Sequence, residues 1–245
     1  MASIKKSIIK FCMAGSLVVL CLTGCGGKKA GEDEIKQKET VSKTNEKATP
    51  ISQGIPVYGK KDKGIIREFL AGLPNGYLNA EEVRELGILA GEYSVRNYSK
   101  EEREYHQEKW QEFFEKSREH DQILERGKKG EAVHDIGMEI AVVMVNYTTE
   151  GDPIYDYISY INGTYCYYSD NSRDSFGSGE ATCLEYEDLR EYTNMEEQRT
   201  NFYLVKNADM SEKKMEEMLS SEEGYSMKKL LQVYSVDYVE DTANK

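Results

Sequence analysis

Acidic and polar residues gather in two short stretches of the sequence, one on each side of a run rich in tyrosine. The first stretch contains Glu150 and Asp152, and the second contains Asp170, Arg173 and Asp174. Carboxylates on converging loops can hold Ca²⁺ through hard oxygen ligands, which makes these residues weak candidates for a ligand site. The alternative is structural: the Asp side chains shape turns and Arg173 neutralises a neighbour. We favour the structural interpretation.

Enzymatic chemistry has little support beyond these carboxylates. Two carboxylates can carry out glycoside hydrolysis. A cell-envelope hydrolase that uses carboxylates of the 150–152 and 170–174 loops is therefore the alternative to the non-enzymatic function predicted below. The sequence contains no Gly-rich phosphate loop, G-x-S-x-G, H-E-x-x-H or C-x-x-C motif. The second stretch also departs from a calcium loop, because Ser175 stands where the turn glycine is expected. We therefore assign no catalytic residue, metal ligand or cofactor.

The cysteines offer a different chemistry. Cys12 and Cys21 lie in an N-terminal apolar segment, Cys25 follows it, and Cys166 and Cys183 lie in predicted strands. A disulfide between the last two is geometrically possible on consecutive strands. Two separate buried thiols are the favoured alternative. A reactive nucleophile is the least favoured, because no His is placed beside either thiol.

A predicted hairpin positions both acidic stretches. Asn162-Gly163 separates two aromatic and β-branched runs, and a type I′ turn requires positive φ at both central residues. Residues 154–161 and 164–170 should therefore pair, and Met138–Thr149 should form a preceding central strand. The two acidic stretches then meet at one end of the sheet. The predicted pairs are Tyr160 with Tyr165, Ile158 with Tyr167, Ser159 with Cys166, and Tyr157 with Tyr168.

Helices should cover this sheet. Ser99 and Glu102 form a capping box, and Gly127 suits the end of a helix, so residues 100–126 should be one long helix. Short helices are predicted at 65–70, at 79–86 and after residue 209 or 211. Strands are predicted at 88–98, 182–189 and 201–206, with a polar turn at 191–200. The segment 227–239 is predicted to be a helix followed by a strand. The fold class is α+β, with an antiparallel sheet of about five strands packed by one long helix and short flanking helices.

The N-terminus reads as an export signal. Lys5, Lys6 and Lys10 precede a short apolar run, too short to span a bilayer, that ends in Leu22-Thr23-Gly24-Cys25. This ending resembles the lipobox of bacterial lipoproteins, which implies cleavage before Cys25 and a diacylglyceryl group on its thiol. Residues 25–54 are polar and should be a disordered tether, which leaves 55–245 as a single extracytoplasmic domain. The alternative is an ordinary export signal or an N-terminal anchor helix.

The charge of the chain excludes one class of partner. The formal net charge is −12, and loss of the three signal-peptide lysines would make it about −15. Such a balance argues against broad electrostatic binding of DNA, RNA or anionic lipid. Eighteen tyrosines against six phenylalanines indicate many aromatic rings at half-exposed positions.

Two motifs carry a family resemblance. Y-T-T-E-G-D-P-I at 147–154 and D-N-S-R-D-S-F-G at 170–177 resemble small lipoproteins, mostly from Gram-positive bacteria, that are classed as a domain of unknown function. The resemblance covers about residues 128–185 and implies an exported, lipid-anchored α+β domain without an established activity. This chain has a longer helical segment before the sheet and an additional C-terminal section.

The leading functional prediction is a membrane-anchored extracytoplasmic lipoprotein that acts as a non-enzymatic binding or interaction module. Its membrane contact would be the lipid on Cys25, and its partner an envelope protein or a small ligand, not nucleic acid.

Overall fold

The computed structural model describes residues 54–91, 95, 98–174, 181–194, 198–221 and 226–237. They belong to one compact unit that begins at residue 46. The predicted signal peptide, Cys25 and the tether up to residue 53 lie outside the described residues, so these assignments stay predictions. No helix in the described ranges is both long and apolar enough to cross a bilayer.

Five strands form a mixed sheet in the order β1-β2-β3-β4-β5. Their bounds are β1 Leu89–Ala90, β2 Glu139–Tyr147, β3 Pro153–Ile161, β4 Thr164–Asp170 and β5 Thr182–Tyr186. The α+β class is confirmed. One departure from the prediction is that β1 pairs with β2 in parallel. A parallel pair needs a long crossover connection, and the helix at residues 100–128 lies in that connection.

The central hairpin matches its prediction. All four expected cross-strand pairs occur between β3 and β4. Asn162 and Gly163 have φ values of 47° and 89°, as a type I′ turn requires. The side-chain oxygen of Asn162 also accepts a hydrogen bond from the backbone N–H of Met138 at 2.8 Å. The turn is thereby tied to the residue that precedes β2.

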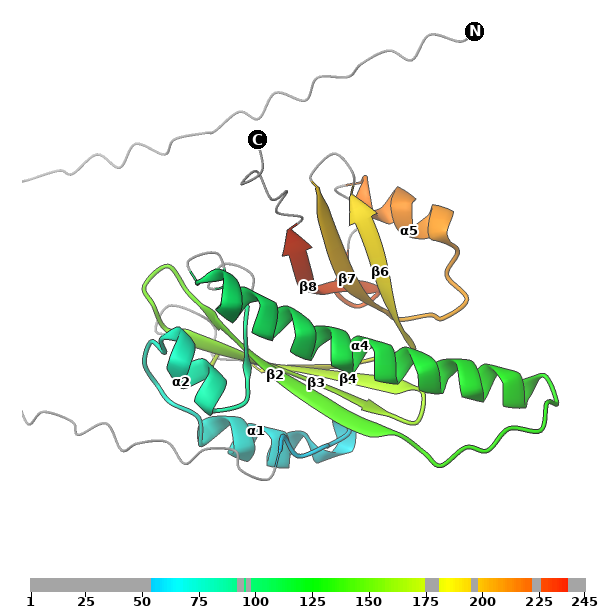
Figure 1. The fold of residues 1–245 in the computed structure, drawn as a ribbon, viewed down its shortest axis with the longest axis horizontal. Coiled ribbons are helices and arrows are strands. Elements are labelled where there is room, and N and C mark those ends of the chain that lie inside the picture. The colour runs from blue at the N-terminus through cyan, green and yellow to red at the C-terminus, as the bar shows by residue number, and fades with distance from the viewer. Residues whose placement is uncertain are drawn as a thin grey trace, which may run out of the picture. The chain divides into compact units, whose positions relative to one another are not determined.

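Helices cover both faces of this sheet (Figure 1). The 3-10 turn η1 Lys60–Asp62, α1 Lys63–Ala71 and α2 Ala80–Glu85 lie on one face, and α4 Lys100–Lys128 lies on the other. Ser99 caps α4 by accepting a hydrogen bond from the N–H of Glu102 at 3.2 Å, as predicted. The predicted end at Gly127 is wrong. The helix continues to Lys128, and Gly130, with φ of 82°, takes the left-handed position.

A second sheet has the strand order β6-β7-β8. Its strands are β6 Asp188–Asn194, β7 Arg199–Val205 and β8 Leu230–Asp237. The helix α5 Glu212–Leu219 lies between β7 and β8 in the chain. This sheet corrects three predictions. The predicted strand 182–189 bends at Glu187 and continues into the second sheet, and the predicted polar turn at 191–200 is mostly strand. The helix predicted after residue 227 is wrong, because residues 227–229 form a turn and β8 begins at Leu230, whereas the strand predicted after that helix is confirmed. An edge strand with one polar side resembles a turn in sequence, because its side chains do not all enter a core.

Tyrosine rings fill the cores on both faces of the five-stranded sheet, and the hydroxyls of several of them reach polar partners. Tyr155 and Tyr157 pack toward α1 and α2 and donate to the carbonyls of Pro74 and Pro56, both at 2.9 Å. On the α4 face, Trp110 is fully buried and stacks on Tyr234 of β8 at 4.7 Å between ring centroids. That core therefore joins α4 to both sheets. The sheet can be apolar on both sides because both are covered.

Candidate functional site

The predicted acidic edge lies where β2 and β4 end. Thr148 and Asp152 close a turn: the N–H of Asp152 donates to the Thr148 hydroxyl at 3.1 Å, and the N–H of Thr148 donates to the Asp152 carbonyl at 3.0 Å. Gly151 takes a φ of 91° in this turn. Glu150 is exposed and accepts a hydrogen bond from Thr149 at 2.9 Å. The contacts shown here are those of a turn.

Asp170 and Arg173 form a buried clamp. The side chains are 3% and 9% exposed, and Arg173 donates to Asp170 at 2.8 Å. Arg173 also donates to the carbonyls of Leu70 and Leu73, at 2.7 and 3.2 Å, and to Asn75 at 2.6 Å. The clamp therefore ties the end of β4 to the carbonyl end of α1, where helix carbonyls lack partners within the helix.

Asp174, the last member of the acidic edge, follows the clamp in a turn, and its N–H donates to the carbonyl of Asn171 at 3.1 Å. The residues 175–177 of the second motif lie outside the described residues. Within the described ranges, no group of three His, Cys, Asp or Glu side chains is arranged to hold a metal ion. The observed contacts of Asp170 and Arg173 follow the structural interpretation of this edge.

Cys166 and Cys183 are neighbours on β4 and β5. Both thiols are free, Cys166 is buried, and Cys183 is partly exposed. Cys166 lies opposite Glu185 and Cys183 lies opposite Tyr168, so the two cysteines are diagonal partners on one face of the sheet. The two thiols influence each other: the pKa of Cys166 is raised and that of Cys183 is lowered. The structure therefore brings the two thiols together without a disulfide between them.

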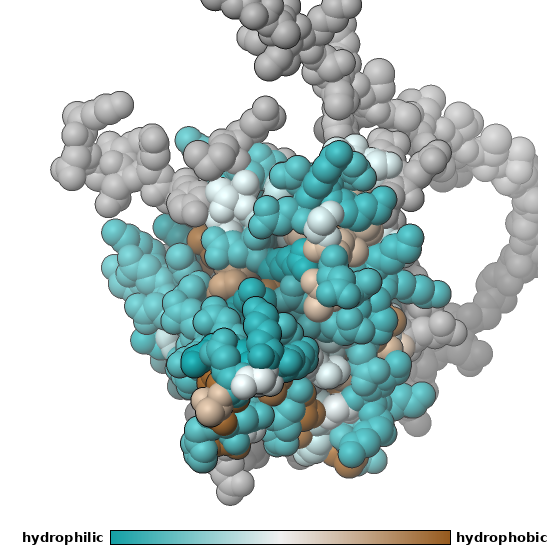
Figure 2. All heavy atoms as spheres, turned by 90° about the vertical axis from the view of Figure 1, so that its right-hand side faces the viewer, coloured by the Kyte–Doolittle hydropathy of each residue, from teal (hydrophilic) through white to brown (hydrophobic). Residues whose placement is uncertain are grey.

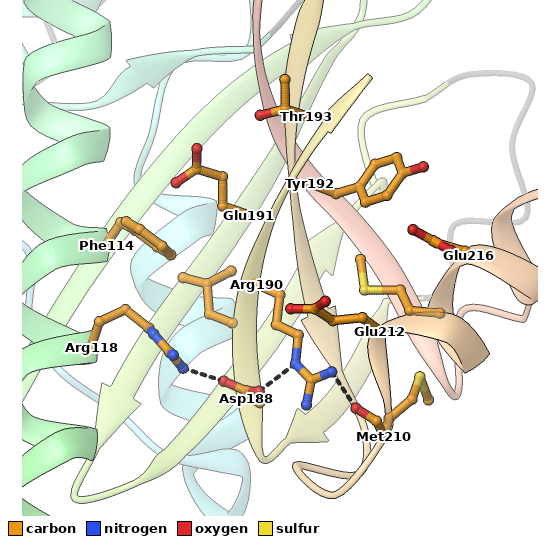
Figure 3. Close-up of a pocket in the computed structure, with 12 residues that line it drawn as sticks. Phe114, Arg118, Asp188, Arg190, Glu191, Tyr192, Thr193, Met210, Glu212 and Glu216 are labelled. Carbon is orange, nitrogen blue, oxygen red and sulfur yellow. Dashed lines mark hydrogen bonds and ion pairs between the residues drawn. The ribbon is translucent and has the colours of Figure 1, made fainter. Parts of the chain in front are cut away.

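A pocket of about 660 Å³ lies along β6, between α4 and α5. Glu191 extends from β6 toward α4, whereas Tyr192 extends toward α5 (Figure 3). The pocket therefore reaches both sides of this strand. Its lining comprises Phe114 and Arg118 of α4, Asp188–Thr193 of β6, and Met210, Glu212, Met215 and Glu216 in and before α5.

A chain of ion pairs forms one end of this pocket (Figure 3). Asp188 accepts from Arg118 and from Arg190, both at 2.6 Å. Arg190 also donates to the carbonyls of Met210 and Ala208, which fastens the segment before α5 to β6. Asp188 is only 8% exposed and therefore needs these cations. The arginines thus have acidic or carbonyl partners within the protein.

The rest of the pocket is acidic and partly apolar. Glu191, Glu212 and Glu216 are exposed at its mouth, and Phe114 and Tyr192 are half-buried in its walls. The side of the molecule on the right in Figure 1 is mostly hydrophilic, with small apolar patches between the polar side chains (Figure 2). Three carboxylates beside aromatic and methionine side chains suit a partner that combines positive charge with apolar groups.

A buried polar network lies nearby under α4. Tyr160 and Tyr165 donate to the two carboxylate oxygens of Asp121, at 2.7 and 3.0 Å. His120 bridges the Tyr160 hydroxyl and the Asp135 carboxylate, both at 2.8 Å. Burial raises the pKa of Asp121, although the two tyrosine hydrogen bonds oppose the shift. The network satisfies polar groups inside the core and links α4 to the hairpin.

Sequence reasoning missed both the pocket and this network. The pocket was missed because most of β6 was predicted as a turn. A signal that could have identified the strand is the alternation of side chains in the sequence. Arg190 and Tyr192 lie on one face of β6, and Glu191 and Thr193 lie on the other. For the network, helical spacing places His120 near the packing side of α4, but no spacing pairs Asp121 with tyrosines about 40 residues away.

The fold and this site define an α+β domain with a mixed polar and apolar pocket along β6, the outer strand of its second sheet. Residues 132–203 match the model of a family described as a domain of unknown function (DUF4362). The predicted resemblance to such a family is confirmed, and the match runs further toward the C-terminus than predicted. It includes β6, whereas α4 and α5 lie outside it. No match was found among curated proteins or solved structures.

Proposed function

We propose that the protein is a lipid-anchored extracytoplasmic lipoprotein whose α+β domain is a non-enzymatic binding module. The pocket along β6 is its binding surface. The observation that carries this proposal is the combination of a pocket and an edge strand: β6 forms one border of its sheet, and the pocket opens on both sides of it.

An edge strand offers backbone N–H and C=O groups to a partner. A segment in extended conformation can add to such an edge, and its main-chain hydrogen bonds then supply affinity while alternate side chains enter pockets on the two faces. Residues on the two faces of β6 line the pocket, which fits this mode of binding. We therefore propose an extended segment of an envelope protein as the partner.

The charges at the pocket select the chemistry of that segment. Glu191, Glu212 and Glu216 outnumber the cations that remain for a ligand, because Asp188 and backbone carbonyls engage Arg118 and Arg190. A basic segment with alternating apolar residues satisfies the carboxylates and packs on Phe114 and the methionines. An acidic segment meets repulsion at the same mouth.

The acidic edge supports a binding module more than a hydrolase. A hydrolase needs two carboxylates that face each other across an open cleft. Asp170 instead points into its own clamp with Arg173. This contact is the arrangement expected of a structural loop.

Fluorescence anisotropy with labelled synthetic peptides tests the binding proposal. We expect a peptide that alternates lysine and valine to bind saturably, and one that alternates glutamate and valine to bind far more weakly. Hydrogen exchange of the amides of residues 188–194 should slow when the first peptide binds, because strand addition protects edge N–H groups.

The matched control for this test lies on the same helix. Glu212→Gln with Glu216→Gln should weaken binding of the lysine peptide several-fold, because both carboxylates line the pocket. Glu217→Gln removes a charge from the same helix, but its partners are Lys213 and Lys214. That variant should bind normally. Equal loss in both cases, or equal binding of the acidic peptide, would reject the proposed surface.

The anchor needs a separate test. Labelling with a radioactive fatty acid should mark the wild-type chain and not the Cys25→Ala variant. Persistent acyl label in that variant would exclude Cys25 as the lipidation site, without any consequence for the pocket.

A further inference from the structure

Cys166 and Cys183 lie side by side as free thiols, one buried and one partly exposed. This arrangement differs both from a structural disulfide and from two separate buried thiols. Cys166 is 3% exposed within the core below α1. Cys183 packs against that core from β5, which forms the outer border of the five-stranded sheet, and it is partly exposed. Cys183 is therefore partly reachable from solvent, and Cys166 lies behind it at the diagonal position on the neighbouring strand.

The charged groups around Cys183 favour its thiolate. Lys60 of η1 and Lys63 carry positive charges that lower the pKa of Cys183, whereas the negative charge of Glu185 raises it. Lys60 also pairs with Glu185 at 3.4 Å. The neighbouring Cys166 thiol lowers the pKa of Cys183, against the effect of burial. The Cys183 thiol and burial raise the pKa of Cys166. Tyr168 lies opposite Cys183, and burial raises its pKa.

We propose that these two cysteines form a thiol–disulfide exchange site for small disulfides, in which Cys183 attacks and Cys166 resolves. The Cys183 thiolate forms a bond to one sulfur of the small disulfide, and the other sulfur leaves as a thiolate. Cys166 then loses its proton and attacks Cys183, which releases the second thiolate. The product is a Cys166–Cys183 disulfide: two electrons have passed to the small disulfide, and its two thiolates take up the protons.

The position of the pair favours a reversible bond. Diagonal residues on neighbouring antiparallel strands are about 7–8 Å apart between Cα atoms, whereas disulfides usually span less than about 7 Å. Closing the bridge therefore draws β5 toward β4. β5 has five residues and, among the described strands, borders only β4, so a shift of β5 disturbs a single strand pairing. A disulfide formed with such a displacement is easily reduced, which is a property of exchange sites and not of permanent cross-links.

Alkylation of the full chain with iodoacetamide, followed by peptide mapping, tests the reactivity of Cys183. Each unit by which the pKa of a thiol falls gives about tenfold more thiolate at pH 6, and the lower intrinsic nucleophilicity of that thiolate offsets about threefold. Because the pKa of Cys183 is lowered, we expect this thiol to react about threefold or more faster at pH 6 than an ordinary exposed cysteine. In Cys166→Ser and in Cys166→Ala, its pH midpoint should move upward.

Incubation with oxidised glutathione tests the division of roles. The wild-type chain should acquire a Cys166–Cys183 disulfide that dithiothreitol reverses, Cys166→Ser should hold glutathione on Cys183, and Cys183→Ser should hold none on Cys166. Circular dichroism selects the folded variants, and the wild-type result alone suffices if a variant fails to fold. An adduct on Cys166 in Cys183→Ser, or no disulfide in the wild-type chain, would overturn the proposal.

Discussion

Replacement of Arg173 by alanine should strongly destabilise the fold, although Arg173 lies in a loop. Its side chain is 9% exposed and donates to Asp170, Asn75 and two carbonyls at the end of α1. Its guanidinium also lies over the ring of Tyr155, 4.9 Å from the centroid. The substitution removes all of these contacts at once. It leaves the Asp170 carboxylate buried without its cation.

The size of the effect follows from that uncompensated charge. Removal of one partner from a buried ion pair costs about 3–5 kcal/mol. For a domain of this size, about 2–4 °C of melting temperature corresponds to each kcal/mol, so the midpoint should fall by about 6–20 °C. Asp170→Asn in the Arg173→Ala background should recover part of the loss, because it removes the buried charge.

Urea unfolding followed by fluorescence measures this cost. The chain has one tryptophan, Trp110, which is fully buried and reports unfolding of the core under α4. Arg126→Ala is the matched control, because Arg126 pairs with Glu131 on the surface with both side chains about half exposed. The control should cost about 1 kcal/mol or less. An equally small loss for Arg173→Ala would refute the clamp as a major source of stability.

Two further predictions concern close packing and pH. Gly91→Ala should destabilise the fold by about 1–3 kcal/mol, because a Cβ at Gly91 would lie 1.6 Å from the side-chain oxygen of Asn146; thermal unfolding measures the loss, and the close approach is disproved if the melting temperature is unchanged. Asp121→Asn should flatten the pH dependence of the unfolding free energy. Since burial raises the folded pKa of Asp121, its contribution to stability is present below the unfolded pKa of about 3.9 and is lost as pH rises through the folded pKa. Denaturant titrations across the acidic range should show the wild-type chain losing stability relative to Asp121→Asn as pH rises; a constant difference would contradict this assignment.

Local patterns predicted much of the first sheet. The Asn162-Gly163 turn fixed the β3–β4 register, because only a few residue types accept two consecutive positive φ values. Ser99 likewise determined the start of α4 by capping its N-terminal amides. Both features depend on residues that are close in sequence, which is why a pattern could find them.

Strands were predicted at 201–206 and near the end of 227–239, where β7 and β8 lie, but β6 and the separate sheet escaped prediction for the opposite reason. β6 is an edge strand whose residues face α4 and α5, and neither contact can be inferred from its own sequence. The bend at Glu187 also depends on packing, because β5 on one side of it belongs to the first sheet and β6 on the other side belongs to the second. The pocket exists only because these elements converge.

The sequence by itself determined the α+β class, the hairpin register and the presence of two cysteines on consecutive strands, because turns, caps and strand periodicity are local properties. Only the tertiary structure decided that Arg173 points into the carbonyl end of α1, that β6 borders a pocket, and that Cys166 is buried while Cys183 is partly exposed. The physical reason is that burial, hydrogen bonding and charge neutralisation depend on neighbours from distant parts of the chain. The carboxylates that looked most like a site in the sequence include a member, Asp170, that holds the fold together.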